Sequence, residues 1–164
     1  MTIAEVLLPE FDQEMATTRR VLERVPTDKG EWKPHEKSFA LGHLAQLVSS
    51  MPSWLTRIVK GEDIDLSEGP GYTFESTTDL VAAFDKNVRE SRAAIAATSD
   101  ETFALPWALK MGDKVLMSLP RDVTTRQTVN HLVHHRGQLT VYLRLLDVPV
   151  PSIYGPTAVE PWGS

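Results

Sequence analysis

The sequence predicts an all-α protein, a four-helix bundle. Four long segments carry apolar side chains at the three- and four-residue spacing typical of amphipathic helices. Stretches in which Pro, Gly and Asp accumulate separate these segments. The length of 164 residues suits one hydrophobic core. We therefore expect residues 1–164 to form a single helical domain.

The first predicted helix runs from Thr2 to about Val25. Pro9 marks either a kink in this helix or its true start. A loop rich in Pro and Gly follows it. One face of the helix carries residues spaced by three and four positions, namely Phe11, Met15, Thr18, Leu22 and Val25.

Ser38 is the expected cap of the second helix, and Pro52 should bend this helix. The acidic stretch from Gly61 to Glu75 is more typical of a surface connection than of a regular element. The apolar side chains of the helix are Leu41, Leu44, Leu47, Val48, Met51, Leu55 and Ile58.

The third helix is predicted from Thr77 to about Thr98 by the spacing of Leu80, Phe84, Val88 and Ile95. Between Ser99 and Arg121 the periodicity changes around a turn signal at Met111–Lys114. This segment is either a short hairpin or an irregular arm, and we treat it as a long crossover connection.

The fourth helix is predicted over Asp122–Leu146. Its acidic first residue suits the positive end of a helix dipole, and Pro149 follows its end. The tail from Val148 to Ser164 is rich in Pro and Gly, so we expect it to lie extended on the surface.

Composition restricts the function. Cysteine is absent, so any metal must be bound by nitrogen and oxygen ligands. A net charge of -5 argues against direct nucleic-acid binding. No apolar run approaches the roughly 20 residues that cross a bilayer. Because Met1–Leu8 also lacks the features of a signal peptide, we expect a cytoplasmic protein without membrane association.

The informative pattern is the histidine run of the fourth helix, Asn130–Arg136. His131 and His135 lie one turn apart, so both imidazoles can bind one metal ion. Gln138 and Tyr142 continue this face. In a dry core such a polar stripe needs a metal, a water cluster or a substrate as its partner. The alternative is a pair of hydrogen-bonded or half-exposed side chains.

The segment Asn130–Leu139 resembles the helix-four signature of the DinB/YfiT-like family, the damage-inducible DinB superfamily. Weaker matches are Trp32–Ser38, Met51–Trp54 and Val148–Pro156, so the resemblance covers nearly the whole chain. It implies a four-helix bundle with long crossovers, commonly a homodimer. It also implies a divalent metal, usually zinc or nickel, held by two histidines of helix four and one of helix two.

His131 and His135 match the two helix-four ligands of this family. The resemblance implies the helix-two ligand in the phrase Leu-Ala-x-His, but here Leu47 stands at that position. His43 lies one turn earlier, about 40° around the helix and about 6 Å along it. Either His43 is the third ligand, or the site has two histidines and is weakened or lost. Gln46, on a neighbouring face, is a poorer zinc ligand than imidazole.

Three histidines would leave a coordination position open, as in catalytic metal sites. The metal could then activate either a water or a thiol, and the resemblance favours the thiol. The expected enzyme is a thiol S-transferase or a small-molecule hydrolase in stress or detoxification. No HExxH element accompanies the pair, which disfavours peptide hydrolysis. The alternative is a metal-free helical binding or dimerisation protein. Gln138, Tyr142 and Tyr154 are candidates for orienting a substrate.

Overall fold

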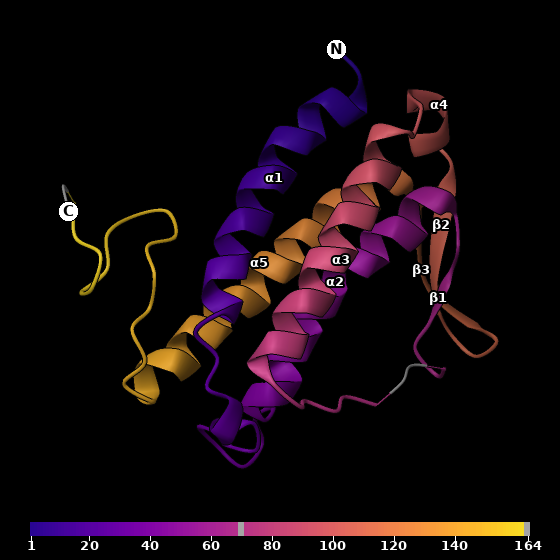
Figure 1. Cartoon of the computed structure of the whole chain (residues 1–164). Coiled ribbons are helices and arrows are strands. Elements are labelled where there is room, and N and C mark those ends of the chain that lie inside the picture. Colours follow the sequence, from indigo (N-terminus) through magenta and orange to yellow (C-terminus); the bar gives the residue numbers. More distant parts are fainter. Residues whose placement is uncertain (69–70, 163–164) are drawn as a thin grey trace.

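The computed structural model describes residues 1–68 and 71–162, and four long helices dominate it (Figure 1). α2 packs against both α3 and α5, and α1 packs against the same two helices. The mostly helical class predicted from the sequence is therefore confirmed. The four helices are α1 (Ile3–Leu22), α2 (Leu41–Lys60), α3 (Thr77–Ala96) and α5 (Arg121–Leu145).

Side-chain caps fix the starts of two of these helices. Thr2 accepts a hydrogen bond from the Glu5 backbone N–H, and the Glu5 carboxylate accepts one from the Thr2 N–H in return. Ser76 likewise accepts a hydrogen bond from the Asp79 N–H at the start of α3. These contacts satisfy N–H groups that have no partner within the helix.

α2 begins differently, and the predicted cap at Ser38 is wrong. The preceding residue is Ala40, which has no capping side chain. Backbone carbonyls of the loop before α2 replace the cap, because the Leu41 and Gly42 N–H groups donate to Trp32 and Gly30. The helix then continues through Pro52 to Lys60. α1, in contrast, ends at Leu22, three residues before the predicted end.

One apolar core lies between the four helices. α1, α2 and α3 bury most of the apolar positions that their periodicity predicts, although Val88 of α3 is only partly buried. Each of the four helices contributes side chains that are at most 2% exposed. Truncating such a side chain to alanine typically costs about 2–5 kcal/mol of stability. Examples from the four helices are Phe11, Met51, Phe84 and Leu139.

A small three-stranded sheet accompanies the helices, which corrects the all-α prediction. β2 (Pro106–Met111) and β3 (Lys114–Pro120) form an antiparallel hairpin around Gly112, whose φ is 56°. The structure thus selects the hairpin from the two alternatives for this segment. A short helix, α4 (Asp100–Phe103), precedes it.

The third strand, β1 (Ile64–Asp65), pairs in parallel with β2 inside the stretch predicted to lack regular structure. Two side chains explain this pairing. Trp107 of β2 is 4% exposed, and its indole N–H donates to the Glu62 carbonyl at 2.8 Å. Lys110 forms an ion pair with Asp63. Burial of one large aromatic ring therefore fastens the segment after α2 to the hairpin.

The C-terminal tail is irregular and surface-lying as predicted, but it is fastened to the helices. Val150 is 7% exposed, and Arg20 of α1 donates to the Ser152 carbonyl and pairs with Glu160. Residues 163–164, the last two of the predicted tail, lie outside the described residues. None of the described helices is long and apolar enough to cross a membrane.

Candidate functional site

His131 and His135 meet on the exposed side of α5. Their Nε2 atoms lie 2.9 Å apart, and the other ring nitrogen of His135, Nδ1, lies 2.7 Å from Gln138 Oε1. Since an amide oxygen only accepts, Nδ1 of His135 carries the proton and its Nε2 keeps a lone pair. His131 then donates the hydrogen bond between the two rings. Gln138 therefore orients His135 in the tautomer that binds metals through Nε2.

The spacing of the pair fits two ligands of one divalent metal. In a tetrahedral zinc site with Zn–N bonds of about 2.0–2.1 Å, two ligand nitrogens lie about 3.3 Å apart. The observed 2.9 Å is slightly shorter, as expected for two rings that share a proton. Small ring rotations would open this separation enough to admit an ion.

The pair does not lie in a dry core, and it forms the hydrogen-bonded, half-exposed arrangement that was the alternative to a metal site. His131 is exposed and His135 is half-buried. The core face of α5 is instead formed by Leu132, Leu139 and Leu143, which are at most 1% exposed. The polar stripe is consequently solvated, and its existence alone does not require a bound partner.

The electrostatics at His131 favour the neutral imidazole. Partial burial lowers the pKa of His131 below its ordinary value of 6.5, and repulsion from His135 and His134 lowers it further. Neutral imidazole is the form that binds a metal, because the lone pair must be free. The lowered pKa therefore favours neutral His131, which would bind a metal through Nε2 once the proton on that nitrogen moves to Nδ1.

His43 of α2 lies between two aromatic rings. The Phe39 ring stacks on one side at a centroid distance of 4.3 Å, and the Tyr72 ring on the other at 4.1 Å. Burial, and then the charge of Lys33, lower its pKa. No group of three His, Cys, Asp or Glu side chains among residues 1–68 and 71–162 is arranged to hold a metal. His43 thus does not join the pair in this conformation.

Neither alternative side chain of α2 completes the pair. Leu47 is 8% exposed and belongs to the apolar core. The Gln46 amide donates to the Thr73 carbonyl and lines a different cavity.

Arg136, next to His135, is the residue whose role the sequence analysis missed. It is 1% exposed, and its Nη2 lies 2.7 Å from Glu14 Oε2 of α1. Its Nη1 also donates to the Glu14 carbonyl and to the Thr18 hydroxyl. The sequence did contain a signal for this ion pair: Arg136 lies on the apolar face of α5, and Glu14 lies on the apolar face of α1. Arg136 therefore anchors the histidine turn of α5 to α1.

The three residues proposed to orient a substrate have contacts within the protein. Gln138 binds His135, and the Tyr142 hydroxyl donates to the Phe39 carbonyl at 3.3 Å. The Tyr154 hydroxyl lies 2.8 Å from both Glu14 and Arg136. Partial burial, and then the hydrogen bond to Glu14, raise the pKa of Tyr154.

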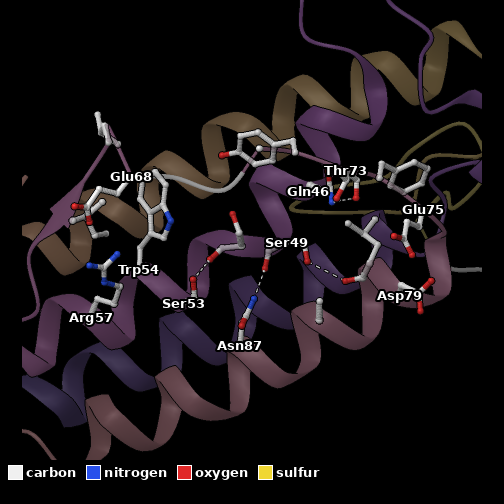
Figure 2. Close-up of a pocket in the computed structure, with 18 of the residues that line it drawn as sticks. Gln46, Ser49, Ser53, Trp54, Arg57, Glu68, Thr73, Glu75, Asp79 and Asn87 are labelled. Carbon is white, nitrogen blue, oxygen red and sulfur yellow. Dashed lines mark hydrogen bonds between the residues drawn. The ribbon is translucent and has the colours of Figure 1, made fainter. Parts of the chain in front are cut away.

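Two cavities flank the histidines. The smaller, of about 410 Å³, lies between the loop before α2 and α5, and its lining includes His135, Gln138, Tyr142 and Lys37. The larger, of about 820 Å³, lies between α2, α3 and the segment before α3 (Figure 2). Trp54 lines the larger cavity, and its ring centroid is 6.2 Å from that of His131. Both cavities therefore reach side chains that contact the histidine pair.

The chain resembles known proteins over almost its whole length. Residues 1–162 match the model of the DinB family. A DinB-like protein from Bacillus subtilis superposes with a TM-score of 0.70 at 17% identity, covering 89% of this chain and 95% of that one. A DinB-like protein from Bacillus cereus superposes with a TM-score of 0.72 at 18% identity, covering 92% and 97%. No curated protein matches the sequence. Because the family model spans residues 1–162, the chain belongs to the DinB family.

Proposed function

We propose that this protein is a divalent-metal-dependent enzyme of the DinB family, a thiol S-transferase or small-molecule hydrolase. His131 and His135 would hold zinc or nickel, and His43 would supply a third imidazole. The four long helices would form the family's four-helix bundle with long crossovers, as a cytoplasmic homodimer. When bound, the metal would supply either a thiolate or a water of lowered pKa as the nucleophile.

The observation that carries this proposal is the pair of Nε2 atoms 2.9 Å apart, with His135 oriented by Gln138. A pair of merely solvated histidines has no need for a fixed tautomer. Gln138 supplies the outer contact by which metal-binding histidines are usually oriented.

The present contacts of the His43 ring are weak, so a change of its side-chain conformation would cost little. Among the described residues no hydrogen bond holds its ring, which is retained by stacking on Phe39 and Tyr72. These two neighbours are 45% and 42% exposed, so they can shift without disturbing the core. Each aromatic contact is worth about 0.5–1.5 kcal/mol, which a metal–imidazole bond would offset.

The smaller cavity is the proposed substrate site. It adjoins His135, and Lys37 and Ser38 offer a cation and a hydroxyl at its rim. A small anionic thiol or carboxylic acid derivative suits this lining. The chain's residues would thus bind the substrate beside the metal and leave activation of the nucleophile to the ion.

An activity assay tests this function. Protein loaded with zinc or nickel is incubated with a low-molecular-weight thiol and an alkylating electrophile, and the loss of free thiol is followed. In parallel, ester and amide substrates are assayed for hydrolysis. The proposal predicts turnover by the loaded protein and background rates for His135→Ala. Equal rates for both proteins in every assay would contradict it.

A second function is favoured by Leu47, which occupies the position of the family's helix-two ligand and is buried in the core. In this case the protein would be a metal-free helical binding or dimerisation module. Sedimentation of the metal-free protein as a stable dimer, together with no metal affinity, would favour this function over the enzyme.

A further inference from the structure

We propose that the larger cavity binds a linear aliphatic diamine or polyamine. This site lies between α2, α3 and the segment that precedes α3, and neither His131 nor His135 lines it. The inference is therefore independent of the metal-dependent function proposed above. It rests on the hydrogen-bonding character of the cavity floor, on the charges at its two ends and on its aromatic side chains.

The floor offers hydrogen-bond acceptors. Three serines of α2 line the cavity, and each donates its only hydroxyl hydrogen to a backbone carbonyl: Ser49 to Leu80, Ser50 to Leu47 and Ser53 to Ser50. The three serine oxygens can therefore only accept hydrogen bonds from a ligand. A ligand rich in N–H donors matches this floor, whereas a phosphate or carboxylate does not.

Two amides add to the excess of acceptors. The Asn87 side chain of α3 uses its NH₂ group to donate to the Ser49 carbonyl, which leaves its carbonyl oxygen without a hydrogen bond among the described residues. The buried Oε1 of Gln46 also has no hydrogen-bond partner in the described structure. A buried acceptor without a partner costs stability, and a ligand donor in the cavity would relieve this cost.

Carboxylates lie at both ends of the cavity. Figure 2 shows Glu75 and Asp79 at one end, and Glu68 beside Trp54 and Arg57 at the other. Neither Glu68 nor Glu75 forms an ion pair with another described residue. Arg57 donates to the Asp63 carbonyl and keeps its positive charge, but Asp65 and Glu68 both line the cavity near it, so carboxylates outnumber the cation at this end. Two separated negative ends therefore favour a ligand with a cation at each end.

Three aromatic side chains also line the cavity. They are Trp54, Tyr72 and Phe74. Aromatic faces attract ammonium groups and also pack against methylene chains. A chain of methylene groups with an ammonium at each end could pack against the aromatic rings and pair with the carboxylates at both ends.

Isothermal titration calorimetry tests this inference. The probes are 1,4-diaminobutane, longer α,ω-diamines and spermidine, titrated into untagged protein freed of metal on a chelating resin. We expect saturable binding of one ligand per chain with a Kd below about 1 mM. Glu68→Gln and Glu75→Gln should each weaken binding about tenfold, because each removes a charge-assisted contact. Glu10→Gln, which changes an exposed carboxylate of α1 outside the cavity, should leave the Kd unchanged.

Two further comparisons separate this site from the metal site and from general charge attraction. His135→Ala should keep the full diamine affinity even if it abolishes the proposed metal binding. Butane-1,4-diol should bind far more weakly than the diamine of the same length. The inference is overturned if no diamine binds saturably, if the diol binds equally well, or if Glu68→Gln and Glu75→Gln leave the affinity unchanged.

Discussion

Arg136 Nη2 lies 2.7 Å from Glu14 Oε2, and this ion pair joins α5 to α1 inside the core. Arg136 also directly follows His135, so the same turn of α5 carries a buried anchor on one side and a metal-ligand candidate on the other. Because the anchor fixes the rotation of α5 about its axis, it helps to place His131 beside Trp54 of α2 and His135 at the smaller cavity.

Removing one partner of this pair should be costly. We expect Arg136→Met to lower the free energy of unfolding by about 3–5 kcal/mol, because Glu14 would be left buried without its cation. The double variant Arg136→Met with Glu14→Met should recover most of this loss. Urea unfolding at neutral pH measures both. A loss below about 1 kcal/mol in the single variant would show that the pair has no such role.

The hydroxyl of Tyr154 should couple this cluster to pH. Its pKa is raised in the folded protein, so folding favours the protonated phenol. The resulting stabilisation is fully present below the unfolded value of about 10 and is lost as pH rises through the higher folded value. We expect the stability difference between wild type and Tyr154→Phe to be constant up to about pH 9 and to shrink above pH 10. Urea unfolding between pH 8 and 11 measures this difference, and a constant difference would contradict the assignment.

Gln138 should set the metal affinity without being a ligand. We expect Gln138→Ala to weaken zinc binding about 10–100-fold, since His135 would lose the contact that fixes its tautomer. Gln127→Ala, an exposed glutamine of the same helix, is the matched control and should bind zinc like wild type. Competition titration with a zinc chelator gives both affinities. Equal zinc affinities of the two variants would show that Gln138 does not orient His135 for metal binding.

Leu47→His should convert α2 to the family's phrase Leu-Ala-x-His. We expect this variant to bind zinc at least about tenfold more tightly than wild type, and to make His43 dispensable. Leu47→Ala controls for the loss of the apolar side chain. If Leu47→His binds zinc no better than wild type while its unfolding remains cooperative, position 47 cannot supply a third ligand to the histidine pair.

Periodicity alone predicted the four long helices because each must bury one apolar stripe. Periodicity did not predict the start of α2 or the small sheet, because contacts between distant parts of the chain determine both. Backbone carbonyls of Gly30 and Trp32 start α2 without a side-chain cap, and burial of Trp107 creates a sheet that local spacing does not specify.

In the candidate site, too, contacts within one helix could be predicted from the sequence, whereas contacts between different elements could not. Spacing of four residues was enough to bring His131 and His135 together, because both lie on one helix. The position of His43 depends on stacking with Phe39 and with Tyr72, which is 29 positions further along the chain, and spacing within α2 does not reveal such a contact. The role of Arg136 likewise depends on Glu14, on a different helix.

The metal content of the protein decides whether His131 and His135 bind an ion. Untagged protein, purified without added metal, is analysed by mass spectrometry of its elements beside the variant His135→Ala. We expect about one zinc or nickel ion per chain in the wild type and background levels in the variant. A wild type without metal above background, whose thermal stability is also unchanged by added zinc or nickel, would contradict it.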